Sequence, residues 1–147
     1  MQLLRHLFSC ILLLSCTTLV KGQSRMEKEI LELTNEFRAS KGKAPLKLDN
    51  FMSNVAREHS EDMARHHVPF GHSGFEQRVA SIRKEKGPVT ASAENVAYGQ
   101  ETAAEVVNTW IKSPPHRKNM LGDYTAIGIG VSSDKGNTRY FTQLYTR

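Results

Sequence analysis

Apolar residues recur at the spacing of an amphipathic helix over much of the chain, and each such run is closed by glycine or proline. The first three runs predict helices over residues 26–41, 49–66 and 75–86. A fourth helix is expected to open at Thr102 and to be ended by Pro114 and Pro115, which lack backbone N–H groups and clash with a preceding turn.

Side chains at the predicted helix starts support these assignments. Asp49 precedes the second helix and is suited to accept hydrogen bonds from its first N–H groups. Thr102 and Glu105 match a capping box, so we expect Glu105 to have a structural role and no part in chemistry. His59 falls on the apolar stripe of the second helix, which favours a packed, hydrogen-bonded core histidine over a site residue.

The remaining pattern is typical of strands. Residues 93–99 alternate as an extended stretch, and residues 127–131 alternate large apolar residues with glycine, as in a strand that another element approaches closely. Residues 134–137 form a hairpin turn that leads to a strand over residues 139–145. Four helices on a small, mainly antiparallel sheet make an α+β layered domain.

The N-terminal residues differ from the rest. A positive start with Arg5, a short apolar run and small residues near Gly22 predict a secretory signal peptide over residues 1–22, which leaves a single domain over residues 23–147. Alternatively, the residues before Cys16 resemble a lipobox, in which the signal would end before a lipidated Cys16. A cleaved signal peptide predicts a secreted protein, extracellular or periplasmic. A lipidated Cys16 predicts a lipoprotein that contacts the membrane only through this anchor.

Composition narrows the class of protein. The hydrophobic share of 39% and the charged share of 24% are ordinary for a globular protein. The formal net charge is +5 at pH 7, but the basic residues are scattered, which argues against a nucleic-acid surface. Both cysteines, Cys10 and Cys16, lie in the predicted signal, so cleavage after Gly22 leaves no disulfide. We expect a monomer.

Three residues carry the candidate chemistry. His72, Glu94 and His116 each lie in a predicted loop or at the end of an element. His116 follows Pro115, and we expect its imidazole to be displayed in a loop beyond the helix. Two imidazoles and a carboxylate can bind a divalent metal with water completing the shell, or act as acid and base around a bound water. The sequence does not show whether they converge.

Several motifs in the same order resemble one family. They are Leu33-Thr34-Asn35-Glu36-Phe37-Arg38 with Pro45-Leu46, Phe70-Gly71-His72-Ser73, Glu94-Asn95-Val96-Ala97, Trp110 with Ser113 to Leu121, and Tyr124 to Val131. Together they are similar to the bacterial branch of the CAP superfamily, the SCP domain shared by cysteine-rich secretory proteins, antigen 5 and pathogenesis-related proteins. The resemblance covers residue 26 to the C-terminus.

This resemblance implies a three-layer α-β-α sandwich with a central cleft. The family often places two histidines and two acidic residues there, sometimes around zinc or another divalent ion. His72, Glu94 and His116 match three of the four, whereas Ser113 occupies the position of the second acid. Pro115 stands where the family usually has glycine, so this loop cannot adopt a positive φ. With one acid gone, only weak metal binding at His72 and His116 is expected.

Neighbouring motif residues are expected to line or support the cleft. Asn95 and Asn119 are predicted to fix loops through side-chain to backbone hydrogen bonds. Arg117 is predicted to have a structural role near the rim, and Ser113 lies beside the second histidine. Trp110 lies on an apolar helix face, which favours a core position over a ligand platform.

Three hypotheses for function follow, and the sequence leaves open whether the protein is an enzyme, favouring the view that it is not. The first is a binding module that holds a weak divalent metal, such as zinc, and a small or lipid-like ligand. The second is a metal- or water-dependent hydrolase of peptide or cell-envelope substrates, with Glu94 as general base. The third is a surface for a protein partner, with the histidines serving only the fold.

Overall fold

A computed structural model of the chain describes residues 24–147. The predicted signal peptide over residues 1–22, including the alternative lipidation site Cys16, lies outside the described residues. Within residues 24–147, no helix has the length and apolar character needed to cross a membrane.

Helices and strands alternate along the described chain. Their order is α1 (Arg25–Ser40), β1 (Lys47–Leu48), α2 (Asn50–Ala64), α3 (Phe75–Lys86), β2 (Ser92–Tyr98), α4 (Ala103–Lys112), α5 (Pro114–Met120), β3 (Ala126–Ser133) and β4 (Arg139–Thr146). The predicted helix over residues 75–86 has the observed bounds, and the helix caps at Asp49 and Thr102 are confirmed. The two-residue strand β1 was not predicted, because it is too short to show a periodic pattern.

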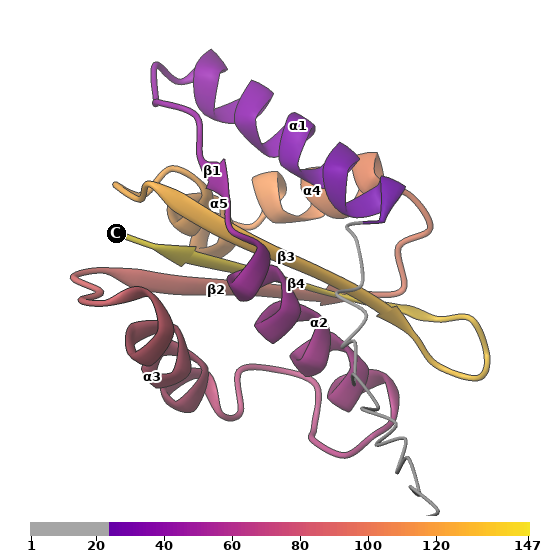
Figure 1. Cartoon of the computed structure of the whole chain (residues 1–147). Helices are drawn as coiled ribbons and strands as arrows, with labels where there is room; N and C mark the ends of the chain where they lie inside the picture. The colour runs from indigo at the N-terminus through magenta and orange to yellow at the C-terminus, as the bar shows by residue number, and fades with distance from the viewer. Residues whose placement is uncertain (1–23) are drawn as a thin grey trace, which may run out of the picture.

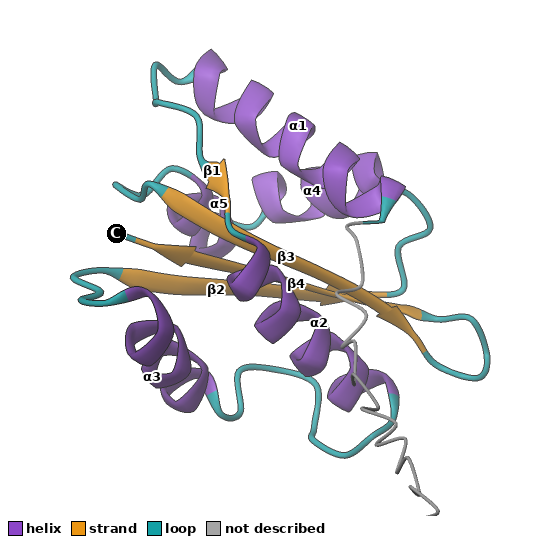
Figure 2. Cartoon of the chain, in the orientation of Figure 1, coloured by secondary structure: helices purple, strands orange, loops and turns teal. Residues whose placement is uncertain are grey.

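The strands form one sheet in the order β1-β3-β4-β2. Strand β1 pairs with β3 in parallel, and the other two pairings are antiparallel. Figure 1 shows α1 and α4 on one side of this sheet and α2 and α3 on the other. Coloured by secondary structure, the strands lie between the two helical layers (Figure 2). The predicted three-layer α-β-α sandwich is therefore confirmed.

Each face of the sheet has its own apolar core. Because side chains alternate along a strand, Phe141 and Tyr145 of β4 join the core with Trp110 of α4, while Leu144 packs with Met52 of α2 on the opposite face. Trp110 is fully buried, and its indole N–H donates to the Val96 carbonyl at 3.2 Å. The predicted core position of Trp110 is confirmed.

Helix α2 approaches β3 closely, and this requires glycine. A Cβ placed at Gly128 would overlap the main chain at Met52, and one at Gly130 would overlap the main chain at Ala56. The alternation of glycine with isoleucine and valine therefore reflects a helix packed against the strand backbone, as the sequence pattern predicted.

The segment after the double proline corrects the sequence prediction. Helix α4 does end before Pro114, but residues 114–120 then form a fifth helix in place of the expected loop. Proline is compatible with a first helical turn, because the N–H groups there have no partner within the helix and the fixed φ suits it. His116 therefore sits in the first turn of α5, is partly buried, and is not displayed on a loop.

We predict that Gly130→Ala lowers the free energy of unfolding by about 3 kcal/mol or more, because the added methyl group must displace α2 from β3. Urea denaturation followed by circular dichroism measures this change. Gly136→Ala, in the hairpin turn where an added Cβ meets only the Asp134 side chain at 3.3 Å, is the matched control. Equal stability of the two variants would contradict the close packing of α2 on β3.

Candidate functional site

The site is organised around a buried carboxylate on the edge strand β2. The side chain of Glu94 is 2% exposed. Two groups from elsewhere in the chain satisfy backbone carbonyls of this strand: Asn119 donates to the Glu94 carbonyl at 3.1 Å, and Trp110 donates to the Val96 carbonyl. The position of the Glu94 carboxylate is thus fixed by a strand whose edge is tied to α4 and α5.

Arg78 of α3 neutralises this carboxylate. Its Nε lies 2.8 Å from Glu94 Oε2 and its Nη2 lies 2.7 Å from Glu94 Oε1, a bidentate arrangement. Its third nitrogen, Nη1, donates to the Ser73 carbonyl at 2.7 Å. Arg78 thereby joins α3, β2 and the loop that carries His72.

Arg78 was not predicted from the sequence to be a site residue. Its position next to Val79 places it near the apolar stripe of α3, which was the one available signal. A charged residue on a helix is usually solvated, however, and only the partner on β2 reveals that Arg78 is partly buried in an ion pair.

His72 completes the contacts of the carboxylate. Its Nδ1 lies 2.9 Å from Glu94 Oε1. Because an ionised carboxylate only accepts hydrogen bonds, Nδ1 carries a proton, and in the neutral form of the ring Nε2 is then the nitrogen with the lone pair. The His72 side chain is 52% exposed, so this lone pair belongs to the solvent-facing part of the site. A carboxylate that orients the imidazole of a metal ligand is a recurrent arrangement around metals.

His59 of α2 holds the loop that carries His72. It is 3% exposed, and its Nε2 lies 2.8 Å from the Gly71 carbonyl, immediately before His72. The same Nε2 lies 3.9 Å from Glu94 Oε1. Burial lowers the pKa of His59, so the ring is neutral and Nε2 donates to the carbonyl. The prediction of a packed, hydrogen-bonded histidine is confirmed, and its contacts show that it also positions the loop.

Helix α5 brings His116 toward His72. Asn95 donates to the His116 carbonyl at 3.2 Å, and Asn119 donates to the Asn95 side-chain oxygen at 2.9 Å. Both asparagines make the predicted side-chain to backbone hydrogen bonds, Asn119 to the Glu94 carbonyl, but these bonds join α5 to β2 and do not fix a loop. Burial lowers the pKa of His116, and the neighbouring His72 lowers it further. Among the described residues, the buried Nδ1 of His116 has no hydrogen-bond partner.

The remaining predicted residues lie at the margin of this group. Ser113 connects α4 to α5, and its side chain does not cap α5. Arg117 is exposed, and its Nη1 donates to the Ile111 carbonyl at 3.4 Å, a contact within the local chain. We call the group formed by His59, His72, Arg78, Glu94 and His116 the histidine site.

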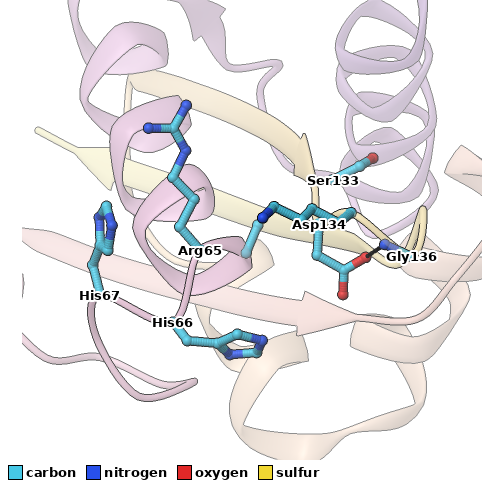
Figure 3. A pocket seen from close by; sticks show the side chains of 8 residues that line it. Arg65, His66, His67, Ser133, Asp134 and Gly136 are labelled. Atoms are coloured by element: carbon cyan, nitrogen blue, oxygen red, sulfur yellow. Dashed lines mark hydrogen bonds between the residues drawn. The ribbon is translucent and has the colours of Figure 1, made fainter.

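A surface hollow of about 830 Å³ lies elsewhere, between the end of α2 and the β3–β4 turn (Figure 3). The imidazoles of His66 and His67 point in different directions there. Two of its side chains have partners outside it: Arg65 pairs with Glu61 at 2.5 Å, and His67 Nδ1 lies 3.2 Å from Asp62 Oδ1. Asp134 accepts from the Gly136 N–H within its own turn. The hollow is therefore a solvated surface rather than a convergent site.

The next question is whether the described residues include a cluster of side chains that could bind a metal ion. Across residues 24–147, no group of three or more histidine, cysteine, aspartate or glutamate side chains is arranged to hold a metal ion. In the histidine site, Glu94 would have been the third ligand, but both oxygens of its carboxylate are bound by Arg78. The available donors are therefore the two imidazoles of His72 and His116.

The chain is an α-β-α sandwich in which His72 and His59 lie near the buried Glu94. Comparison with protein-family models identifies its family. The model described as "CAP: Cysteine-rich secretory protein family" matches residues 31–145. The chain belongs to this family, as its motifs had indicated.

Bacterial relatives agree with this assignment. The chain is 36% identical over 130 residues to the uncharacterized membrane protein YlbC of Bacillus subtilis (strain 168), covering 86% of this chain and 36% of the relative. It is 37% identical over 120 residues to the uncharacterized protein YkwD of the same strain, covering 78% of this chain and 45% of the relative. The chain thus spans less than half the length of these curated relatives.

A solved structure shows the same fold. An extracellular protein containing a SCP domain from Bacillus anthracis str. Ames superposes with a TM-score of 0.71 at 27% identity. The match covers 82% of this chain and 40% of that structure.

We predict that Arg78→Met lowers the free energy of unfolding by about 3 kcal/mol or more, because it leaves the Glu94 carboxylate buried without its cation. Chemical denaturation measures the loss. Adding Glu94→Gln to Arg78→Met should recover part of it, since the uncompensated charge is removed. Arg83→Met, at an exposed arginine of the same helix, is the control. A loss no larger than that of the control would contradict the buried ion pair.

Stability is also expected to fall in acid. The pKa values of His59 and His116 are lowered from 6.5 in the fold, so below that pH the unfolded chain binds more protons than the folded chain. The unfolding midpoint should therefore drop as the pH falls through about 6.5, and this contribution should level off below the folded-state pKa values.

Denaturation midpoints measured between about pH 7.5 and pH 5 test this expectation. His59→Gln, which keeps a donor for the Gly71 carbonyl but cannot titrate, should flatten the dependence. An identical pH dependence in His59→Gln and the parent protein would rule out a contribution from His59.

Proposed function

We propose that this protein is a binding module that acts outside the cytoplasm and uses the histidine site to hold a small ligand together with a weakly bound divalent cation such as Zn²⁺. Export is supported by the signal-like residues 1–22 and by the extracellular SCP-domain relative. One observation carries the choice of binding over hydrolysis: both oxygens of Glu94 are engaged by Arg78, and one of them by His72 as well.

A general base must have a free lone pair within reach of the proton that it removes. The Glu94 carboxylate accepts three hydrogen bonds, two from Arg78 and one from His72, and its side chain is 2% exposed, so little of it is open to a water molecule. It therefore serves as the orienting partner of His72. The hydrolase alternative, with Glu94 as base, therefore has no support in this geometry. The binding alternative is supported because the same contacts fix the tautomer of His72 and leave its Nε2 lone pair free.

The donor set suits a weakly held cation. A neutral His72 with its Nδ1 proton on a carboxylate is the form that binds metals, and the unpartnered Nδ1 of His116 is a second available nitrogen. Structural zinc sites use four protein ligands and catalytic sites three, so two imidazoles would leave most of the coordination sphere to water or to the ligand. A cation held in this way would supply a Lewis-acidic contact for an oxygen of the ligand.

We predict that calorimetric titration of Zn²⁺ into the chelator-stripped protein gives one weak site, which both His72→Ala and His116→Ala abolish. Glu94→Gln should weaken binding by about 10- to 100-fold by loosening the orientation of His72. His67→Ala, which removes an exposed histidine outside the site, is the matched control and should bind as the parent does. Folded protein without measurable Zn²⁺ binding, or binding unchanged in both site variants, would refute the cation proposal.

A further inference from the structure

Two large apolar side chains are exposed among residues 24–147, and they touch each other. Phe70 is 48% exposed and Tyr98 is 53% exposed. Their ring centroids lie 4.7 Å apart at an interplanar angle of 62°, an edge-to-face contact. We call this pair the aromatic shelf. Isolated exposed apolar residues are ordinary, whereas these two rings form one contacting surface.

The shelf rests on rigid structure. Tyr98 stacks on Tyr140 with a centroid separation of 5.7 Å and an angle of 17°, and Tyr140 is 7% exposed. The two tyrosines are direct partners in the β2–β4 ladder. Phe70 adjoins Gly71, whose carbonyl is held by His59. Rings fixed in this way lose little conformational freedom when a ligand stacks on them.

The shelf lies on the same two segments of the chain as the histidine site. Phe70 precedes His72 by two residues on the same loop. Tyr98 lies four residues after Glu94 on β2, and therefore on the same face of the strand. A ligand bound to the exposed imidazole of His72 would thus have an apolar surface beside it.

The size of the shelf limits its occupant. A whole aromatic side chain presents about 150–250 Å², so two half-exposed rings offer roughly 200 Å². A stable protein partner needs about 800 Å² on each side. An acyl chain needs a pocket that encloses most of its surface, which two half-exposed rings do not provide. The shelf fits one six-membered ring.

We propose that the aromatic shelf binds the apolar C–H face of a pyranose ring in a glycan, while His72 binds a hydroxyl at the polar edge of the same sugar. A pyranose matches the surface because one of its faces is apolar and its rim is a ring of hydroxyl groups. The neutral imidazole offers a hydrogen-bond acceptor at Nε2, and the Tyr98 hydroxyl offers a donor and an acceptor. This inference rests on the proposed binding function, since it gives the ligand class of that site.

The test is an NMR titration of the protein with cellotriose, chitotriose and maltotriose, each in chelator and again with Zn²⁺. At least one sugar should give saturable shifts of the Phe70 and Tyr98 ring signals at millimolar concentrations. Tyr98→Ala should weaken binding by about tenfold through loss of the stacking face. Phe70→Leu keeps an apolar side chain of similar bulk without a ring and should weaken binding comparably, whereas Tyr98→Phe should retain most of it.

Each outcome decides between the proposals. If none of the sugars shifts the ring signals while Zn²⁺ binds at His72 and His116, the glycan inference is wrong and the proposed cation site stands. If a sugar binds in chelator and is lost in Tyr98→Ala and Phe70→Leu, the inference stands even where Zn²⁺ binding fails. Shifts produced by laurate and by no sugar, and kept in Phe70→Leu, would overturn it in favour of an acyl ligand.

Discussion

The ion pair between Arg78 and Glu94 is the interaction on which the site depends. A carboxylate with 2% of its side chain exposed is tolerated only when a cation and further donors replace the lost water. Arg78 supplies both, because two of its nitrogens bind Glu94 and the third binds the loop before α3 at Ser73. Charge compensation therefore also fixes the position of the loop that presents His72.

A second network, of buried amides and hydroxyls, connects this ion pair to the far layer of the sandwich. Asn95 follows Glu94 and points to the opposite face of β2, where it contacts Gln143 and Tyr145 of β4. Gln143 in turn donates to Thr34 of α1 at 2.9 Å. Fully paired polar groups in a core constrain register, because a shift of one residue would leave them unpaired. The network thus sets the register of β2, and with it the position of Glu94.

The sequence predicted what is local and periodic. The glycines at 128 and 130 identified the close approach of α2, and the caps at Asp49 and Thr102 fixed where helices begin. The ion pair of Arg78 could not be predicted, because its partner lies 16 residues away on another element. Helix α5 was missed because its seven residues are too few for a periodic signal and the prolines read as breakers, although proline is compatible with a first turn.

The charge balance of the site bears on what it can recognise. One guanidinium cancels one carboxylate, and burial keeps the pKa of His116 low, so that ring is neutral at physiological pH. Strong attraction of a highly charged ligand requires an uncompensated field, which this arrangement does not provide. A neutral, hydroxyl-rich ligand needs oriented hydrogen-bonding groups and an apolar face instead. The Nδ1 contact of His72 and the rings of Phe70 and Tyr98 are the two features on which the proposed recognition of a neutral ligand rests. With both oxygens of the carboxylate bound by Arg78, that proposal uses Glu94 to orient His72 and not to contact the ligand.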